Sequence, residues 1–262
     1  MIAAFGMYDR AETAAAHDRL WTLAHAQFQT LGIDAPKDLT RGDLAYRAGW
    51  VSPDLLVSQT CGLPLRSYLR GQVTLVGTPD YGLPGCEAGY YRSVLLVRRA
   101  DPRSGLREFS GARFAVNDGH SQSGWAAACQ TFDAADIWPG SCVMSGAHRK
   151  SALLVAQGAA DLCAVDAVTW RAMTRWDDYA ADLRVVAETD PTPGLPLITA
   201  LSRDPAPIFS AMQAAIRELS EADAQILGLR SLVQVPLNSY LDQPIPPTLD
   251  QIFAKSAQSF AT

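Results

Sequence analysis

Residues 114–127 read FAVNDGHSQSGWAA, and this stretch decides the fold. A short apolar run ends at Asn117, and Ser121 and Ser123 then open an alanine-rich segment typical of a helix. A strand that leads into a helix in this way indicates an α/β unit. Serine hydroxyls and unpaired backbone N–H groups at a helix start suit an anion, whereas the simpler interpretation makes Ser121 only an N-cap.

Strands and helices alternate along most of the chain, which predicts an α/β fold with largely parallel sheets. The expected strands are residues 2–6, 54–58, 72–77, 91–99, 113–117, 141–145, 161–165, 183–187 and 197–201. The expected helices are residues 11–31, 43–48, 64–70, 148–157, 206–219, 221–227 and 249–260, with two more after Ser123 and around Trp170.

Two changes of pattern, near residues 99–105 and 187–194, predict two α/β lobes. We expect residues 1–99 and 191–262 to form one discontinuous lobe, with residues 100–190 inserted as the second. An insertion gives two chain crossings, which make a hinge with a cleft between the lobes.

The composition of the chain argues against two classes of protein, nucleic-acid-binding proteins and membrane-spanning proteins. The chain has 262 residues, of which 48% are hydrophobic, and its formal net charge is −5. The negative charge and the lack of a Lys/Arg block argue against a nucleic-acid partner. No apolar run reaches the ~18 residues that a membrane span needs.

The N-terminal residues and the cysteines bear on the cellular compartment of the protein. Residues 1–6 are typical of a strand rather than a signal peptide, so the sequence alone allows either a cytoplasmic protein or an exported one whose leader was removed. Cys61 and Cys86 lie in loops rich in Gly and Pro, where a disulfide would suit an exported protein. The five cysteines fit no zinc spacing, so no metal site is expected.

Polar residues follow several expected strands, where ligands of α/β proteins collect. They are Tyr8, Gln59, Thr60, Ser121, His148 and Asp166.

Three motifs occur in order along the chain. Residues 91–97 fit Y-x-S-V-x-x-V, residues 117–124 fit N-D-x-x-S-x-S-G, and residues 145–166 fit S-G-x-H-x-x-[AS]-x-x-x-V-x-x-G-x-x-D-x-x-x-[VI]-D. Together they resemble the phosphate, phosphite and phosphonate substrate-binding proteins of ABC importers. That resemblance implies a type II periplasmic-binding-protein fold, a periplasmic location, and a small anionic solute and an ABC permease as partners.

The resemblance also implies roles for individual residues. Ser121 and Ser123 would bind the oxyanion oxygens, His148 would contact the anion when protonated, and Tyr91 would face the site. Asp166 matches a family acidic position only approximately; its carboxylate would accept a proton from a P–OH group or pair with an amine. Two positions depart from the pattern: Gln122 replaces a hydroxyl residue, and Leu195 stands where some phosphonate binders have aspartate.

Other functions stay open at this point. Ser123, His148 and Asp166 follow the order of a hydrolase triad, but the G-x-S-x-G elbow is absent. An enzyme of cofactor biosynthesis or a sensor could share the fold, because fold does not fix function. We therefore expect a binding protein without catalytic residues or a cofactor, whose ligand is phosphate, a phosphonate, a sulfonate or a heterocyclic precursor.

Overall fold

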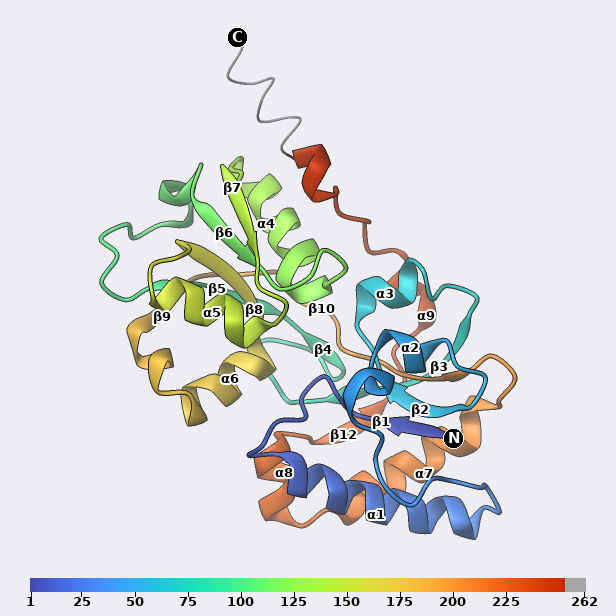
Figure 1. Cartoon of the computed structure of the whole chain (residues 1–262). Helices are drawn as coiled ribbons and strands as arrows, with labels where there is room; N and C mark the ends of the chain where they lie inside the picture. The colour runs from blue at the N-terminus through green and yellow to red at the C-terminus, as the bar shows by residue number, and fades with distance from the viewer. Residues whose placement is uncertain (253–262) are drawn as a thin grey trace. The chain divides into compact units, whose positions relative to one another are not determined.

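The structure, a computed structural model, describes residues 1–252 (Figure 1). The described chain forms two compact units, residues 1–90 with 193–243 (unit 1) and residues 91–192 with 244–252 (unit 2). The helix expected at 249–260 lies, from residue 253 onward, outside the described residues.

Unit 1 is built on a five-stranded sheet of order β1-β2-β11-β3-β12. Its strands are β1 (Ile2–Ala4), β2 (Leu55–Gln59), β3 (Val73–Asp80), β11 (Leu197–Ala200) and β12 (Ser231–Val233). Its helices are α1 (Ala14–Thr30), η1 (Gly42–Ala45), α2 (Arg47–Trp50), α3 (Gly62–Arg66), α7 (Pro205–Glu218), α8 (Glu221–Leu227) and α9 (Leu237–Leu241).

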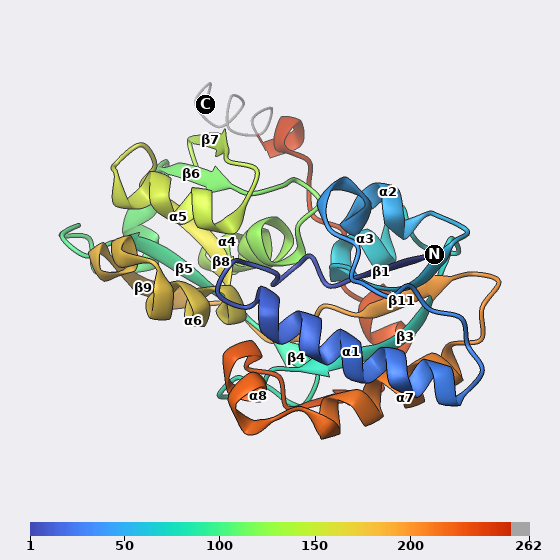
Figure 2. The same cartoon turned by 60° about the horizontal axis from the view of Figure 1, so that its bottom comes forward.

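Alternating side chains of this sheet enter two apolar clusters. In β1, Ala3 packs with α1 and α7, while Ile2 and Ala4 pack on the other side with Trp50. This period of two is what a strand buried on both faces requires. Figure 2 shows α1 and α7 side by side. Helix α1 ends before Gly32, whose positive φ of 67° is the backbone conformation that glycine adopts at a helix end.

Unit 2 has a second five-stranded sheet, of order β7-β6-β8-β5-β9. Its strands are β5 (Ser93–Arg98), β6 (Arg113–Val116), β7 (Ser141–Met144), β8 (Leu162–Asp166) and β9 (Leu183–Glu188). Its helices are η2 (Leu106–Phe109), the π-helix η3 (Gln122–Ala126), α4 (Ala127–Ala135), α5 (His148–Ala156), α6 (Ala167–Trp176) and η4 (Asp178–Asp182).

The sheet of unit 2 is also covered on both faces. Leu95 and Val97 of β5 pack with α4, while Val94 and Leu96 pack with α5 and α6. The strands β6, β7 and β8 are parallel to one another. Their carboxyl ends therefore lie at one edge of the sheet, and this edge carries the starts of η3, α5 and α6.

The unit boundaries differ from those expected from the sequence. We expected residues 91–99 in the first lobe, but β5 pairs with β8 on one side and β9 on the other, which places it in unit 2. Residues 244–252 also belong to unit 2, because Ile252 is buried in its apolar core. Within the described residues the chain passes between units three times, not twice. At the first two passages β4 (Tyr90–Tyr91) pairs with β10 (Thr192–Pro193).

The expectation of largely parallel sheets is also wrong. In unit 1, β11 is antiparallel to both β2 and β3, and β12 is antiparallel to β3. In unit 2, β5 is antiparallel to β8 and β9. The cause is topological: β5 and β11 each enter a sheet from a passage between units, not through a βαβ crossover.

Candidate functional site

The turn after β6 brings the two predicted serines together. Ser121 precedes the π-helix η3, and its Oγ accepts a hydrogen bond of 2.9 Å from the N–H of Gly124. The Oγ atoms of Ser121 and Ser123 are 3.5 Å apart. We call residues 121–126 the serine turn. The sequence predicts a helix start here but not its π form, which is frequent at functional sites.

The glycine of this turn is required by its neighbours. A Cβ at Gly124 would lie 1.7 Å from Oδ1 of Asn117 and 3.0 Å from Cε1 of His148. Only a residue without a side chain lets both groups close on the turn. Asn117 and Gly124 were part of the quoted motif but not of the predicted site, although the spacing N-D-x-x-S-x-S-G contains both.

Two further predicted residues meet the serine turn. His148 begins α5, and its Nε2 lies 2.8 Å from Oγ of Ser123 and 3.5 Å from Oδ2 of Asp166. Asp166 ends β8 and caps α6, where its Oδ1 accepts a hydrogen bond of 2.8 Å from the N–H of Thr169. The structure thus joins residues that are up to 45 positions apart, 121 to 166, at one sheet edge.

Burial controls the charge of the histidine. Desolvation lowers the pKa of His148, while the Asp166 carboxylate and a hydrogen bond with the backbone of Ala164 act in the opposite direction with smaller effect. The net effect lowers the pKa of His148 and favours the neutral imidazole. Burial therefore disfavours the charged imidazole on which a charge-assisted contact from His148 would depend.

The geometry does not match a hydrolase triad. In a triad the histidine uses one ring nitrogen for the serine and the other for the aspartate. Here Ser123 and Asp166 approach the same atom, Nε2. Asp166 therefore cannot hold the tautomer that would make Ser123 a nucleophile.

Three of the predicted ligand-binding residues, Tyr8, Gln59 and Thr60, lie in unit 1. The Gln59 side-chain amide donates to the hydroxyl of Tyr81 at 3.0 Å, and the rings of Tyr8 and Tyr81 meet edge to face with centroids 5.0 Å apart. Thr60 is fully buried and its N–H donates to the carbonyl of Pro196 at 2.9 Å. Tyr81 was missed because the expected strand 72–77 stopped short; β3 extends to Asp80, which places Tyr81 at its carboxyl end.

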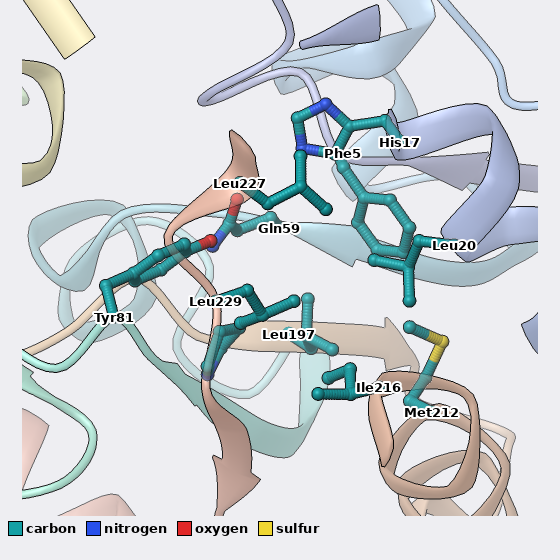
Figure 3. Close-up of a pocket in the computed structure, with 11 residues that line it drawn as sticks. Phe5, His17, Leu20, Gln59, Tyr81, Leu197, Met212, Ile216, Leu227 and Leu229 are labelled. Atoms are coloured by element: carbon teal, nitrogen blue, oxygen red, sulfur yellow. The ribbon is translucent and has the colours of Figure 1, made fainter. Parts of the chain in front are cut away.

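A small cavity lies beside this group in unit 1 (Figure 3). Its volume is about 20 Å³, room for about one water molecule. Most of its lining is apolar, including Phe5, Leu197 and Met212, and Gln59 turns its amide toward Tyr81 (Figure 3). The cavity is therefore unsuited to an oxyanion.

The two remaining predicted ligand-binding residues, Tyr91 and Gln122, are buried in unit 2. Tyr91 is buried in β4, two residues before Ser93, whose strand position faces Asp166 in the register of β5 and β8. Gln122 lies in the π-helix with its side chain 1% exposed.

Comparison with known proteins identifies the family. Residues 68–235, more than half of the chain, match the family model described as "ABC transporter, phosphonate, periplasmic substrate-binding protein". The chain belongs to this family. No curated protein sequence gives a match.

Solved structures of family proteins show the same fold. The chain is similar to PhnD1 from Prochlorococcus marinus in complex with methylphosphonate, at 15% identity over 98% of both chains and a TM-score of 0.70. It is similar to a binding protein component of an ABC phosphonate transporter from Pseudomonas aeruginosa, at 13% identity over 99% of this chain and 98% of the other, with a TM-score of 0.63.

The fold also serves other ligands. A Xanthomonas citri protein bound to ATP aligns at 17% identity over 95% of this chain and 96% of the other, with a TM-score of 0.62. At these identities the structural likeness shows the periplasmic-binding-protein fold, of the Venus-flytrap type, and not the ligand.

Family membership settles the kind of function. The chain is a substrate-binding component of an ABC transporter, which takes a small solute and delivers it to a permease, and it is not an enzyme. No described helix is long and apolar enough to cross a membrane.

The arrangement of the cysteine, acidic and histidine side chains bears on two kinds of site, a disulfide and a metal site. Cys61 and Cys86, considered above as a disulfide pair, are not disulfide-bonded in the structure, and neither are Cys129, Cys142 and Cys163. Among residues 1–252, no three His, Cys, Asp or Glu side chains are grouped so that they could hold a metal ion.

Replacing Gly124 by alanine should destabilise the protein by about 1–3 kcal/mol, because the new methyl group overlaps Asn117. Gly119→Ala is the matched control, since a Cβ there meets nothing within 4 Å. Thermal or urea unfolding of both variants measures the effect. Equal stability of the two variants would contradict the close packing around the turn.

The His148 imidazole should titrate below 6.5, and Asp166→Asn should lower its pKa further by removing a carboxylate that favours the charged ring. Because the folded pKa lies below the unfolded one, the unfolded chain binds more protons and this group makes stability fall as the pH drops through 6.5. NMR titration of the ring resonances measures both values. A His148 pKa above 6.5, or one raised by Asp166→Asn, would contradict this electrostatic account.

Proposed function

We propose that the serine turn and His148 bind the oxyanion group of a phosphonate or phosphate. The observation that carries this proposal is the convergence of Ser121, Ser123 and His148 at the start of a helix. The two hydroxyls can each donate a hydrogen bond, and His148 donates one from Nε2 when that nitrogen carries a proton. The first N–H groups of a helix have no carbonyl partner within it. The dipole of the helix adds about 0.3–1 kcal/mol of attraction for an anion.

Asp166 gives the proposed site a preference among anions. Its buried carboxylate lies beside the imidazole and would repel a fully ionised oxyanion. A phosphonate or phosphate that keeps one P–OH proton can donate it to the carboxylate, whereas a sulfonate has no such proton near pH 7. The proposed ligand is therefore a monoprotonated phosphorus oxyanion.

We also propose that the remaining predicted residues, Tyr8, Gln59, Thr60, Tyr91 and Gln122, belong to the ligand site. For unit 1, the proposal is supported by the place of Gln59 and Thr60 at the end of β2, and by Tyr81, which bonds to Gln59 and contacts the ring of Tyr8. Tyr91 and Gln122 are supported by their positions near the Asp166 strand and within the serine turn. The family of periplasmic binding proteins supports a periplasmic location and an ABC permease as the partner.

The double variant Ser123→Ala with His148→Ala should bind methylphosphonate and phosphate about 100-fold more weakly or worse, because two hydrogen bonds to a charged group are lost at about 1.5 kcal/mol each. Isothermal titration calorimetry gives the Kd, and unfolding without ligand shows that the variant is folded.

His120→Ala is the matched control, because His120 is in the same loop but its side chain is 55% exposed. It should bind like the parent protein. A double variant with parental affinity would overturn the site, and a parent protein that binds neither probe would overturn the ligand class.

A further inference from the structure

The last described residues return to the unit that carries the serine turn. After α9 the chain leaves unit 1 at Gln243, and residues 244–252 belong to unit 2. Ile252 is 3% exposed and shares an apolar cluster with Phe114, Phe132 and, at its edge, Leu249. We call residues 244–252 the C-terminal segment. It is part of the core that lies beneath α4.

Trp125 connects this segment to the serine turn. It lies within the π-helix, two residues after Ser123, and its side chain is 1% exposed. Its indole Nε1–H donates a hydrogen bond of 2.9 Å to the carbonyl of Pro247. Its ring packs against Phe114, with centroids 6.4 Å apart. A buried indole needs an acceptor for its N–H, and Pro247 supplies it.

The π form of the turn makes this anchor important. The N–H of Ala126 donates to the carbonyl of Ser121, and that of Ala127 to the carbonyl of Gln122, so each bond spans five residues. Such turns are rare and usually single, because an ordinary α-helix has better-formed bonds. Contacts with residues outside the turn must therefore favour the π form. Trp125 is the largest buried side chain of the turn and makes such contacts.

The π form also sets the positions of the proposed ligand groups. Ser123 and Trp125 both lie within the two loops that these backbone bonds close, from Ser121 to Ala126 and from Gln122 to Ala127. In this arrangement of the turn, Ser123 Oγ lies 2.8 Å from His148 Nε2. A constraint on Trp125 is consequently a constraint on Ser123.

We propose that Trp125 and the C-terminal segment act as positioning elements of the oxyanion site, with the indole–Pro247 hydrogen bond maintaining the π turn that orients Ser123. This inference rests on the proposed function of the serine turn. Trp125 does not bind the ligand; it acts through Ser123 and His148.

The main test is Trp125→Phe, which keeps an aromatic ring and removes the indole N–H. We expect its Kd for methylphosphonate, measured by isothermal titration calorimetry, to rise about three- to tenfold, because a turn held less firmly in the π form aligns Ser123 less well with the ligand. The ring resonances of His148 should shift in NMR spectra of the ligand-free variant, because its contact with Ser123 changes.

Trp138→Phe is the matched control. Trp138 packs on Phe132 in the same apolar cluster, with ring centroids 6.3 Å apart, but lies outside the serine turn. We expect parental Kd and unchanged His148 resonances. Ile252→Ala tests the segment itself, because it removes a buried anchor outside the turn; its Kd should rise in the same direction as that of Trp125→Phe.

The outcomes separate a positioning role from a purely structural one. If Trp125→Phe and Ile252→Ala unfold at lower temperature but keep the parental Kd and His148 resonances, the segment only stabilises the fold and the inference is wrong. If Ser123→Ala with His148→Ala abolishes binding while Trp125→Phe does not weaken it, the proposed function stands and the positioning inference alone fails. If the double variant binds normally, the proposed function itself fails.

Discussion

The hydrogen bond between Ser123 Oγ and His148 Nε2, at 2.8 Å, is the interaction on which the candidate site depends. It joins two helix starts that follow two parallel strands, β6 and β7. It forms because Gly124 has no side chain to hold His148 and Asn117 away. Asp166, at the end of β8, completes the group from a third strand. The sheet of unit 2 therefore fixes the chemistry by aligning strand ends.

Much of this arrangement could be predicted from local sequence. Strand ends followed by polar residues predicted the meeting of Ser121, Ser123, His148 and Asp166, because parallel strands end at one edge. The π form of the serine turn could not be predicted, since it depends on Trp125 meeting Pro247, 122 positions later in the chain. Tyr81 was missed for a simpler reason: β3 continues through Thr78 and Pro79 to Asp80, past the glycine where the expected strand ended.

The features of the fold that were predicted wrongly from the sequence depend on contacts between residues distant in the chain. An apolar strand such as β5 has the same local pattern whether it joins one sheet or the other, and only its pairing with β8 and β9 assigns it to unit 2. The same holds for direction, because β11 has no local signal that makes it antiparallel to β2 and β3. The membership of residues 244–252 rests on the burial of Ile252, again a contact distant in sequence.

A crystal structure with methylphosphonate tests most directly whether the serine turn receives a phosphorus oxyanion. We expect phosphonate oxygens within hydrogen-bond distance of Ser121 Oγ, Ser123 Oγ and His148 Nε2, with one oxygen facing the Asp166 carboxylate. Methylphosphonate bound away from the serine turn, or absent from it at saturating concentration, would contradict an oxyanion site there.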